Sequence, residues 1–189
     1  MVSPIKQKLT IQDFYAFIAK PEHTTTIFEL VGGEAIEVPS NPYVSKIAGW
    51  ILTALNLFLR EHDLGHVTGA DGRYIVNGDV YAPDVAYISY ARQPELAKQG
   101  FNPNPPDLAV EVISDPKNAQ EQATLRRKIV NYLSAGTVVW VVDIISETVE
   151  VYDGIQQAQV YGSDDTLNGG EWLPGFVLVI KDIFPKKNT

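Results

Sequence analysis

The sequence predicts an α/β protein built on a mixed β-sheet, and three observations support this fold class. Early in the chain, two β-prone runs, 26–31 and 34–38, flank the glycine pair Gly32-Gly33, which is the signature of an antiparallel hairpin. Two later apolar runs, 108–113 and 138–145, have the continuous pattern of strands covered on both faces. A helical stretch separates these two runs, so they are expected to form a parallel pair joined by a βαβ-like crossover.

The other elements follow from helix signals and from alternating or apolar runs. A short helix, 11–19, begins after Thr10 as N-cap and ends before Pro21. Asn41 followed by Pro42 suits the start of a long amphipathic helix that continues to Gly65. The crossover helix is predicted at about 119–135, with Asn118 as N-cap and Gly136 at its end. Further strands are predicted at 73–76, 80–89, 148–152, 158–161 and 176–180.

Length and composition indicate one domain over 10–184, with short tails at 1–9 and 185–189. The chain has 189 residues, of which 45% are hydrophobic, enough to bury a sizeable core. No window approaches the roughly 20 apolar residues of a membrane span, so we expect no membrane association. The first ten residues do not resemble a signal peptide, and a cytoplasmic location is therefore expected.

Charge and cysteine content restrict the possible chemistry. The chain has no cysteine, which excludes disulfides, thiolate zinc sites and cysteine nucleophiles. Carboxylates become the main candidate metal ligands, and we expect no organic cofactor. The net charge of -8 argues against a protein that coats nucleic acid nonspecifically, because neutralising phosphates requires clustered Lys and Arg. A metal ion in an acidic site could supply part of that positive charge.

Two acidic residues in apolar surroundings are the strongest chemical signal. Glu111 lies inside the apolar run 108–113, where an isolated charge would cost several kcal/mol unless it is paired or bound to metal. Asp84 follows Pro83 and opens another apolar run. Two carboxylates on neighbouring strands suit Mg²⁺ or Mn²⁺ with water and a substrate phosphate. Either acid alone could instead cap a loop or pair with an arginine.

A lysine on the crossover helix is the third candidate. Lys128 lies at the edge of the apolar stripe formed by Leu125, Ile129, Tyr132 and Leu133, so its ammonium group could reach the sheet. There it could stabilise a phosphoryl transition state or orient the attacking water. The alternative is a lysine whose stem covers apolar surface while its charge stays in water.

Five motifs follow one another along the chain, at 28–34, 82–87, 105–114, 125–128 with Tyr132, and 135–143. Together they resemble the Uma-type restriction endonuclease family of the PD-(D/E)XK superfamily. The resemblance extends from about residue 10 to 184, and the set is more specific than any single motif. It implies a restriction-endonuclease-like core with flanking helices and an antiparallel hairpin extension.

By matching position, the resemblance implies a role for each of four residues. Asp84 matches the acid of the PD element, Glu111 the following acid, and Glu29 an acid contributed before the core strands. Ile113 stands where the superfamily has a lysine, and Lys128 matches the helix lysine of this particular family. The implied activity is metal-dependent DNA hydrolysis, with Asp84 and Glu111 as metal ligands. Nucleases of this type often act on two strands, so a homodimer is expected.

Other polar and aromatic residues are interpreted structurally. Capping explains Glu34, Asp107 and Asp143 at strand ends or turns. Arg126 and Arg127 read as a solvated helix face, with contact to a backbone phosphate as the alternative. The histidines share no metal-ligand spacing and are expected at the surface, whereas the tryptophans are expected in the core; these are His23, His62, His66, Trp50, Trp140 and Trp172.

Two other functions compete with the nuclease hypothesis. The first is a non-catalytic nucleic-acid- or protein-binding module that keeps the fold and retains Asp84 and Glu111 as structural caps. The lysine missing at Ile113 and the acidic composition favour it. The second is a sugar hydrolase that uses two carboxylates about 5 to 10 Å apart. No stripe of sugar-stacking aromatic residues supports this second alternative.

Overall fold

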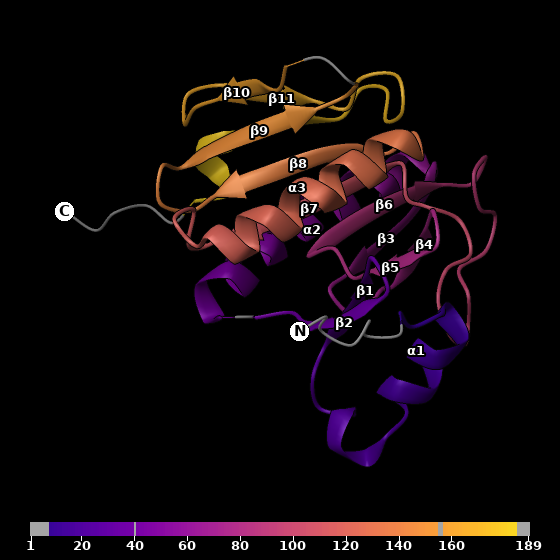
Figure 1. Ribbon diagram of the computed structural model, residues 1–189. Coiled ribbons are helices and arrows are strands. Elements are labelled where there is room, and N and C mark those ends of the chain that lie inside the picture. The colour runs from indigo at the N-terminus through magenta and orange to yellow at the C-terminus, as the bar shows by residue number, and fades with distance from the viewer. Residues whose placement is uncertain (1–7, 40, 155–156, 185–189) are drawn as a thin grey trace.

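The structure is a computed structural model that describes residues 8–39, 41–154 and 157–184 (Figure 1). Its largest sheet has six strands in the order β10-β9-β8-β7-β6-β3. The central strands β7 (Leu108–Ile113) and β8 (Val138–Asp143) run parallel, whereas every other neighbouring pair in this sheet is antiparallel. The other four strands are β3 (Gly65–Gly69), β6 (Val85–Ser89), β9 (Thr148–Tyr152) and β10 (Gln159–Tyr161).

The predicted βαβ crossover is confirmed. Helix α3 (Ala119–Ser134) connects the two parallel strands and begins at Asn118, whose side chain accepts the backbone N–H groups of Gln120 and Glu121. Gly136 follows the helix with φ of 72°, a left-handed conformation that glycine adopts without steric cost. The N-cap and the terminating glycine were both correctly predicted.

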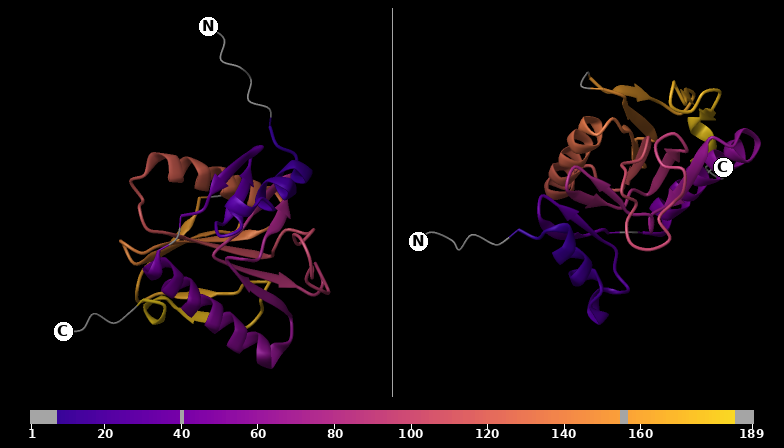
Figure 2. Two further views of the ribbon diagram at one scale, coloured as in Figure 1. Left: turned by 90° about the horizontal axis from the view of Figure 1, so that it is seen from below. Right: turned by 90° about the vertical axis from the view of Figure 1, so that its right-hand side faces the viewer.

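Two helices cover opposite faces of the six-stranded sheet (Figure 2). Helix α2 (Pro42–His62) packs on one face together with Val110 and Val112 of β7, whereas α3 packs on the other face with Ala109. Because successive side chains of a strand point to opposite faces, Glu111 lies on the α3 side. The continuous apolar pattern of β7 and β8 reflects this double coverage.

A second sheet of four strands has the order β2-β1-β5-β4 and adjoins the first (Figure 1). The predicted hairpin forms β1 (Phe28–Val31) and β2 (Glu34–Glu37), and Gly32 and Gly33 both have positive φ, as its tight turn requires. The capping box of Thr10 and Asp13 starts helix α1 (Ile11–Ile18) as predicted. The remaining elements are β4 (Tyr74–Val76), β5 (Asp79–Tyr81), β11 (Thr166–Asn168), β12 (Val177–Val179), η1 (Pro21–His23) and η2 (Ile180–Asp182).

One helix boundary and several strand predictions were wrong in detail. The long helix ends at His62 rather than continuing to Gly65, because Asp63 turns into the left-handed region and β3 starts two residues later. The run 80–89 is two strands rather than one, since it is interrupted around Pro83, which has no N–H for a sheet ladder. As a result, β5 and β6 belong to different sheets. Strands β3 and β11 were not predicted.

The tails predicted at 1–9 and 185–189 fall mostly outside the described residues, as do two residues of the segment between the predicted strands 148–152 and 158–161. Residue Leu9 is described, and its N–H donates to the carbonyl oxygen of Gly33 at 2.8 Å.

Helix α2 also departs from two expectations. Trp50 was predicted to lie in the core, but 50% of its surface is exposed. Among the described helices, α2 alone has a length and composition that would allow it to cross a membrane. The sequence analysis expected no such segment. One face of α2 nevertheless packs into the core through Val44, Ile47, Ile51, Leu55 and Leu59.

Candidate functional site

The ammonium group of Lys128 lies between two carboxylates. Its Nζ donates to Oε1 of Glu29 at 2.8 Å and to Oε2 of Glu111 at 2.7 Å. Only 5% of Lys128 is exposed, so the alternative of a lysine whose charge stays in bulk water is wrong. The sequence had placed Lys128 at the edge of the buried stripe of α3, and the structure places it inside.

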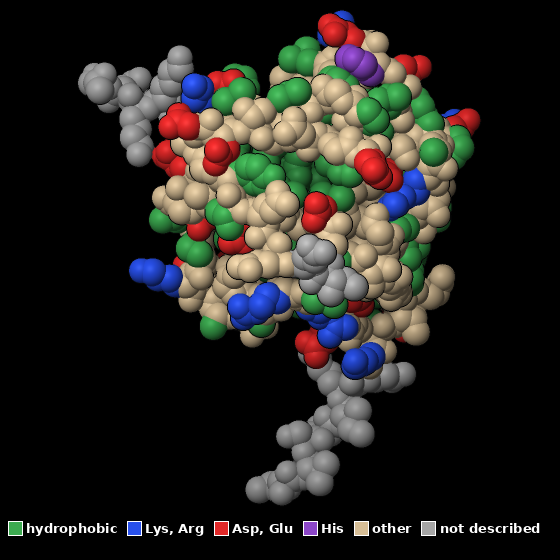
Figure 3. Space-filling view, turned by 90° about the horizontal axis from the view of Figure 1, so that it is seen from above, with side chains coloured by type: hydrophobic (Ala, Val, Ile, Leu, Met, Phe, Trp, Pro, Cys, Tyr) green, Lys and Arg blue, Asp and Glu red, His purple; other side chains and the backbone are tan. Residues whose placement is uncertain are grey.

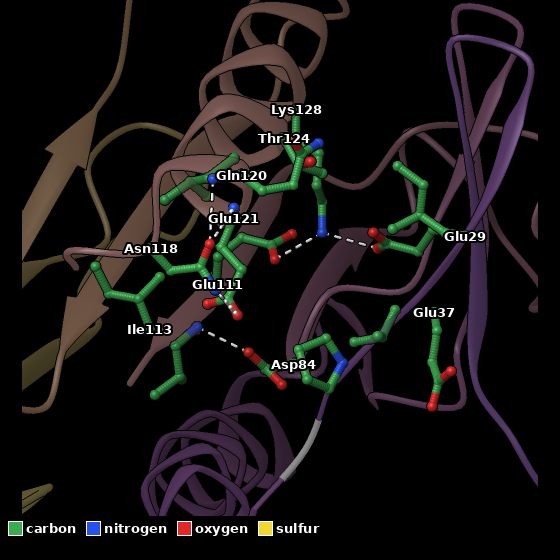
Figure 4. Close-up of a pocket in the computed structure, with 15 residues that line it drawn as sticks. Glu29, Glu37, Asp84, Glu111, Ile113, Asn118, Gln120, Glu121, Thr124 and Lys128 are labelled. Carbon is green, nitrogen blue, oxygen red and sulfur yellow. Dashed lines mark hydrogen bonds and ion pairs between the residues drawn. The ribbon is translucent and has the colours of Figure 1, made fainter. Parts of the chain in front are cut away.

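Glu29 joins the two sheets at this point. It projects from β1 of the smaller sheet, and its Oε1 atom also accepts the backbone N–H of Ala82 at 2.7 Å. That N–H belongs to the segment that leads from β5 to β6. A single carboxylate oxygen therefore binds both the Lys128 ammonium group and the segment that crosses between the sheets. Figure 4 shows its contact with Lys128.

Asp84 and Glu111 are brought together by the antiparallel pairing of β6 and β7. Val85 is opposite Val110, which places Asp84 beside Glu111 at the start of β6. The Oδ2 atom of Asp84 accepts the backbone N–H of Val112 at 2.7 Å. Its Oδ1 atom accepts no hydrogen bond within the described residues. A buried atom without a partner would be an exception there, and Oδ1 is not one, so this oxygen is accessible to solvent. The prediction of two adjacent carboxylates on neighbouring strands is confirmed.

Burial and mutual repulsion act on the protonation of this group. Burial raises the pKa of Glu111, against the attraction of Lys128, and the negative charges of Glu29 and Asp84 raise it further. Burial also raises the pKa of Asp84, although the hydrogen bond from Val112 opposes this. Burial works to lower the pKa of Lys128, but the attraction of Glu111 and Glu29 outweighs it and the pKa is raised. Lys128 is therefore a permanent cation, and the site has a surplus of acids.

A pocket of about 410 Å³ is lined by Glu29, Asp84, Glu111 and Lys128. Its walls are the end of the β1–β2 hairpin on one side and the first turns of α3 on the other. Figure 4 shows Glu29 and Glu111 directed toward Lys128 from opposite sides. Within the described residues no aromatic side chain lines the pocket, which leaves no stacking surface for a sugar ring. The remaining lining residues are Ile36, Glu37, Val38, Pro39, Val112, Ile113, Asn118, Gln120, Glu121, Thr124 and Leu125.

The carboxylates of the pocket could bind a hard divalent cation such as Mg²⁺, but only with water or substrate as additional ligands. Mg²⁺ commonly uses one or two carboxylates and completes its shell with water and substrate phosphate. Asp84 and Glu111 supply such a pair, and an accessible oxygen remains on Asp84. Among the residues that the structure describes, no three Asp, Glu or His side chains gather closely enough to enclose a metal by themselves.

Tyr132 contacts the site, whereas the sequence analysis placed it in the apolar stripe and in a family motif without assigning it a role. It is fully buried, and its hydroxyl group donates to Oε1 of Glu111 at 3.3 Å. The available signal was its spacing, because a residue four positions after Lys128 lies on the same side of the helix. Glu121, which accepts a hydrogen bond from Asn118 at 2.8 Å, and Glu37 also line the pocket and were not identified.

The residues interpreted as caps lie outside the pocket. Asp107 accepts the N–H of Ser89 at 2.6 Å and pairs with Arg92, and Asp143 accepts the N–H of Ile145 at 2.7 Å. Glu34 begins β2 at the hairpin turn. Arg127 pairs with Asp79 at 3.7 Å rather than pointing freely into solvent.

The histidines do not contribute to the pocket either. One ring nitrogen of each histidine is hydrogen-bonded to a backbone carbonyl oxygen. The pairs are His23 with Phe17, His62 with Phe58, and His66 with Pro94. Trp140 is buried as expected, with 1% of its surface exposed, and Trp172 packs against it.

Comparisons with known proteins agree with this architecture. A crystal structure described as a putative nuclease belonging to DUF820 from Anabaena variabilis superposes with a TM-score of 0.76 at 21% sequence identity, covering 93% of this chain and 97% of that one. No curated protein sequence matches. The family model of Uma2, described as putative restriction endonuclease, matches residues 11–181. The chain belongs to the Uma2 family of putative restriction endonucleases.

Proposed function

We propose that this protein is a divalent-metal-dependent endonuclease that hydrolyses phosphodiester bonds, with DNA as substrate. The observation that carries the proposal is the position of Lys128 Nζ, within 2.8 Å of Glu29 and 2.7 Å of Glu111, in the pocket that also contains Asp84. Three acids surround one ammonium group, so the ionised form of Asp84 and Glu111 lacks sufficient positive charge, which a divalent cation would supply.

Each residue has a distinct role in the proposed reaction. Asp84 and Glu111 hold the cation, which when bound supplies charge neutralisation and lowers the pKa of water. Lys128 gives up one of its carboxylate contacts and donates to the phosphate oxygens as negative charge develops on them. Glu29 keeps the Lys128 side chain in place through their 2.8 Å contact. Tyr132 orients Glu111 by its hydrogen bond.

The distribution of charge suits a locally held nucleic acid rather than a broad electrostatic surface. On the face seen in Figure 3, Lys and Arg side chains are scattered and lie mostly near its outline. The net charge is -8. Binding therefore has to depend on the cation and on a few contacts beside the pocket, and we expect a modest salt dependence of affinity.

The test is cleavage of supercoiled plasmid and of single-stranded DNA with Mg²⁺ or Mn²⁺. The variants Asp84→Asn, Glu111→Gln and Lys128→Met are each expected to lose activity by at least about a hundredfold. Asp164→Asn and Lys98→Met change exposed residues outside the pocket and serve as matched controls. Cleavage that persists in all three pocket variants would refute the assignment.

Loss of fold must be separated from loss of chemistry. Circular dichroism and the urea midpoint identify variants that are unfolded under assay conditions. Isothermal titration with Mn²⁺ gives a second readout, because Asp84→Asn should weaken metal binding whereas Lys128→Met should not. Equal metal affinity in wild type and Asp84→Asn would remove Asp84 from the metal site.

A second candidate is a non-catalytic binding module that retains the fold. It is favoured by the way Lys128 already satisfies Glu29 and Glu111 without any added cation. This candidate predicts that Mg²⁺ and Mn²⁺ bind no more tightly than millimolar and that purified protein does not cleave DNA. The assays above distinguish the two.

Two further expectations belong with the proposal. We propose that the active form is a homodimer, because two strands require two active sites. The cytoplasmic location stays a prediction from the sequence.

A further inference from the structure

A second pocket on α3, of about 500 Å³, is lined by two consecutive arginines, Arg126 and Arg127. Both arginines are exposed, and the roles proposed above for the acidic pocket use neither of them. We refer to this second pocket as the arginine pocket. Its other lining residues are Asn77, Asp79, Val130, Asn131 and Ser134.

The two guanidinium groups have hydrogen-bonding capacity that the described residues do not use. Arg126 forms no hydrogen bond or ion pair with any of them. Arg127 has one polar contact, with Asp79 at 3.7 Å, which is longer than a charge-assisted hydrogen bond of about 2.7 to 2.9 Å. A guanidinium group has five N–H donors in a planar fork. Both arginines can therefore donate to a ligand without giving up a strong contact.

The polar groups around the arginines are already hydrogen-bonded. The two carboxylate oxygens of Asp79 accept the N–H of Gly32 and the hydroxyl group of Tyr81, each at 2.8 Å. The side-chain amides of Asn77 and Asn131 donate to other groups of the protein. The arginines therefore supply the donors that remain for a ligand, and such a ligand is an acceptor with negative charge.

The charges at the arginine pocket leave one positive charge in excess. The described lining residues include two arginines and one acid, Asp79. The guanidinium group of Arg127 lies against Gly32, where it leaves no room for a Cβ atom. At the same hairpin turn, Lys8 and Glu34 are both exposed and carry opposite charges. The arginine pocket is thus locally basic in a chain of net charge -8.

The arginine pocket and the acidic pocket adjoin on α3. Thr124 lines the acidic pocket and is labelled in Figure 4, whereas Arg127 lines the arginine pocket. Residues three positions apart are neighbours on a helix surface, with their Cβ atoms about 5 to 6 Å apart. Lys128 follows Arg127 and contacts the acids of the other pocket. An extended ligand can therefore reach both pockets by crossing one turn of α3.

We propose that the arginine pocket binds a phosphodiester group of the substrate strand close to the one that is cleaved. This inference rests on the proposed function, because it takes the ligand to be the strand whose scissile phosphate lies at Lys128. A nucleic-acid strand has a phosphate at every nucleotide, so a strand that crosses α3 presents another phosphate to Arg126 and Arg127. Guanidinium groups bind two phosphate oxygens at once. Contacts of this kind position the strand without reading its sequence.

The first test is binding of a fluorescently labelled single-stranded oligonucleotide and of its duplex, measured by anisotropy in EDTA so that no cleavage occurs. The double variant Arg126→Gln/Arg127→Gln should bind roughly tenfold more weakly or worse. Its plot of log affinity against log salt concentration should lose about one unit of slope, because one phosphate contact is removed. Arg60→Gln changes an exposed arginine on α2 and is the matched control, expected to bind like wild type.

Cleavage kinetics with Mn²⁺ supply a second readout. The double variant should raise KM and leave kcat unchanged, because a phosphate remote from the reacting bond is bound equally in the ground state and in the transition state. Arg126→Lys/Arg127→Lys keeps both charges but lacks the planar fork. This variant should therefore recover part of the lost affinity. An equal loss in the Lys and Gln variants would contradict recognition through charge.

Orthophosphate distinguishes a site for the strand from a site for a free anion. It should compete with the oligonucleotide for wild type and should compete more weakly for the double Gln variant. Loss of orthophosphate binding with unchanged oligonucleotide affinity would overturn the proposal and leave a free-anion site. Equal oligonucleotide affinity and salt slope in wild type and the double Gln variant would also overturn it, as would a wild type that binds no oligonucleotide.

The two proposals fail in different ways. A wild type that binds oligonucleotides through Arg126 and Arg127 but does not cleave them would refute the nuclease assignment and support the phosphate site. A wild type and a double Gln variant that cleave with the same KM would support the nuclease and refute the phosphate site.

Discussion

Lys128 and Arg127 are adjacent in α3, and each pairs with an acid from the sheets, yet their surroundings differ. The Lys128 side chain is 6% exposed and contacts two buried carboxylates at 2.8 and 2.7 Å. The Arg127 side chain is 54% exposed and contacts Asp79 at 3.7 Å. The first pair is shielded from water and the second is not, so similar charges differ greatly in energy and in possible chemistry.

The acids differ in their remaining capacity to bind a ligand. Asp79 already accepts the N–H of Gly32 at 2.8 Å and the hydroxyl group of Tyr81 at 2.8 Å, besides its contact with Arg127. It fastens the hairpin turn to the rest of the protein. Asp84 accepts one backbone N–H and keeps an accessible oxygen in the pocket. A buried acid indicates a binding site when part of its hydrogen-bonding capacity is unused.

The largest expected effect comes from removing the buried cation. Lys128→Met leaves Glu29 and Glu111 without their partner, and should lower the free energy of unfolding by about 3 to 5 kcal/mol at pH 8. Arg127→Met removes an exposed partner and should cost at most about 1 kcal/mol. Urea unfolding of both variants measures this contrast. Similar losses would show that burial does not distinguish the two pairs.

A pH dependence of stability follows from the raised pKa of Glu111. Its pKa is raised from 4.5 to about 8 by burial, so between these values the folded state binds more protons than the unfolded chain. The stability of metal-free protein should therefore fall as pH rises from about 5 to about 8. Glu111→Gln should flatten this fall, which thermal melts in EDTA would measure, and Asp164→Asn should not. A wild-type melting temperature that rises through this range would contradict the prediction.

Neutralising the two comparable aspartates should separate structure from chemistry. Asp79→Asn weakens three contacts and should cost about 1 to 3 kcal/mol, with cleavage per folded molecule unchanged. Asp84→Asn should cost less stability and should abolish tight Mn²⁺ binding. Urea titrations and calorimetry on the same preparations give both quantities. If Asp79→Asn also lost its affinity for Mn²⁺, the contacts of Asp79 and the metal site at Asp84 would not be independent.

The smallest expected effect concerns the two tyrosines that link the regions. The rings of Tyr81 and Tyr132 meet edge to face with centroids 5.1 Å apart, and their hydroxyl groups donate to Asp79 and Glu111. Tyr81→Phe should cost about 1 kcal/mol and leave kcat unchanged. Tyr132→Phe loses a longer hydrogen bond, so it should cost less stability while lowering kcat severalfold. A kcat equal to wild type in Tyr132→Phe would limit Tyr132 to packing.

Much of the fold was predictable because local signals agreed with the tertiary structure. The hairpin at Gly32-Gly33 and the caps of α3 follow from backbone conformations that few residues allow. Strand β3 was missed because its sequence, Gly65–Gly69, has glycine at both ends and little apolar alternation. Only its pairing with β6 makes it a strand.

The sequence identified Asp84, Glu111, Lys128 and Glu29 and the adjacency of the first two, but not the burial of Lys128 or the contact of Tyr132. Glu111 was identified because a charge inside an apolar strand requires compensation, and Lys128 because of its position on α3. Helical periodicity could not show that Lys128 is buried, because that depends on Glu29 from a different sheet. Trp50 was wrongly predicted to be buried because aromatic residues within apolar runs were assigned to the core. The buried side of α2 is formed by other residues, such as Ile47 and Ile51, and Trp50 lies outside that row.

The contact between Glu29 and Lys128 has a consequence for the stage of folding at which the site is complete. These residues are 99 positions apart, and Glu29 is also bonded to Ala82, 53 positions away. Contacts between distant parts of a chain form late in folding because a large loop must close first. A ribosome-bound or truncated chain that lacks α3 has no assembled site. The proposed hydrolysis is therefore restricted to molecules in which α3 has packed against β1.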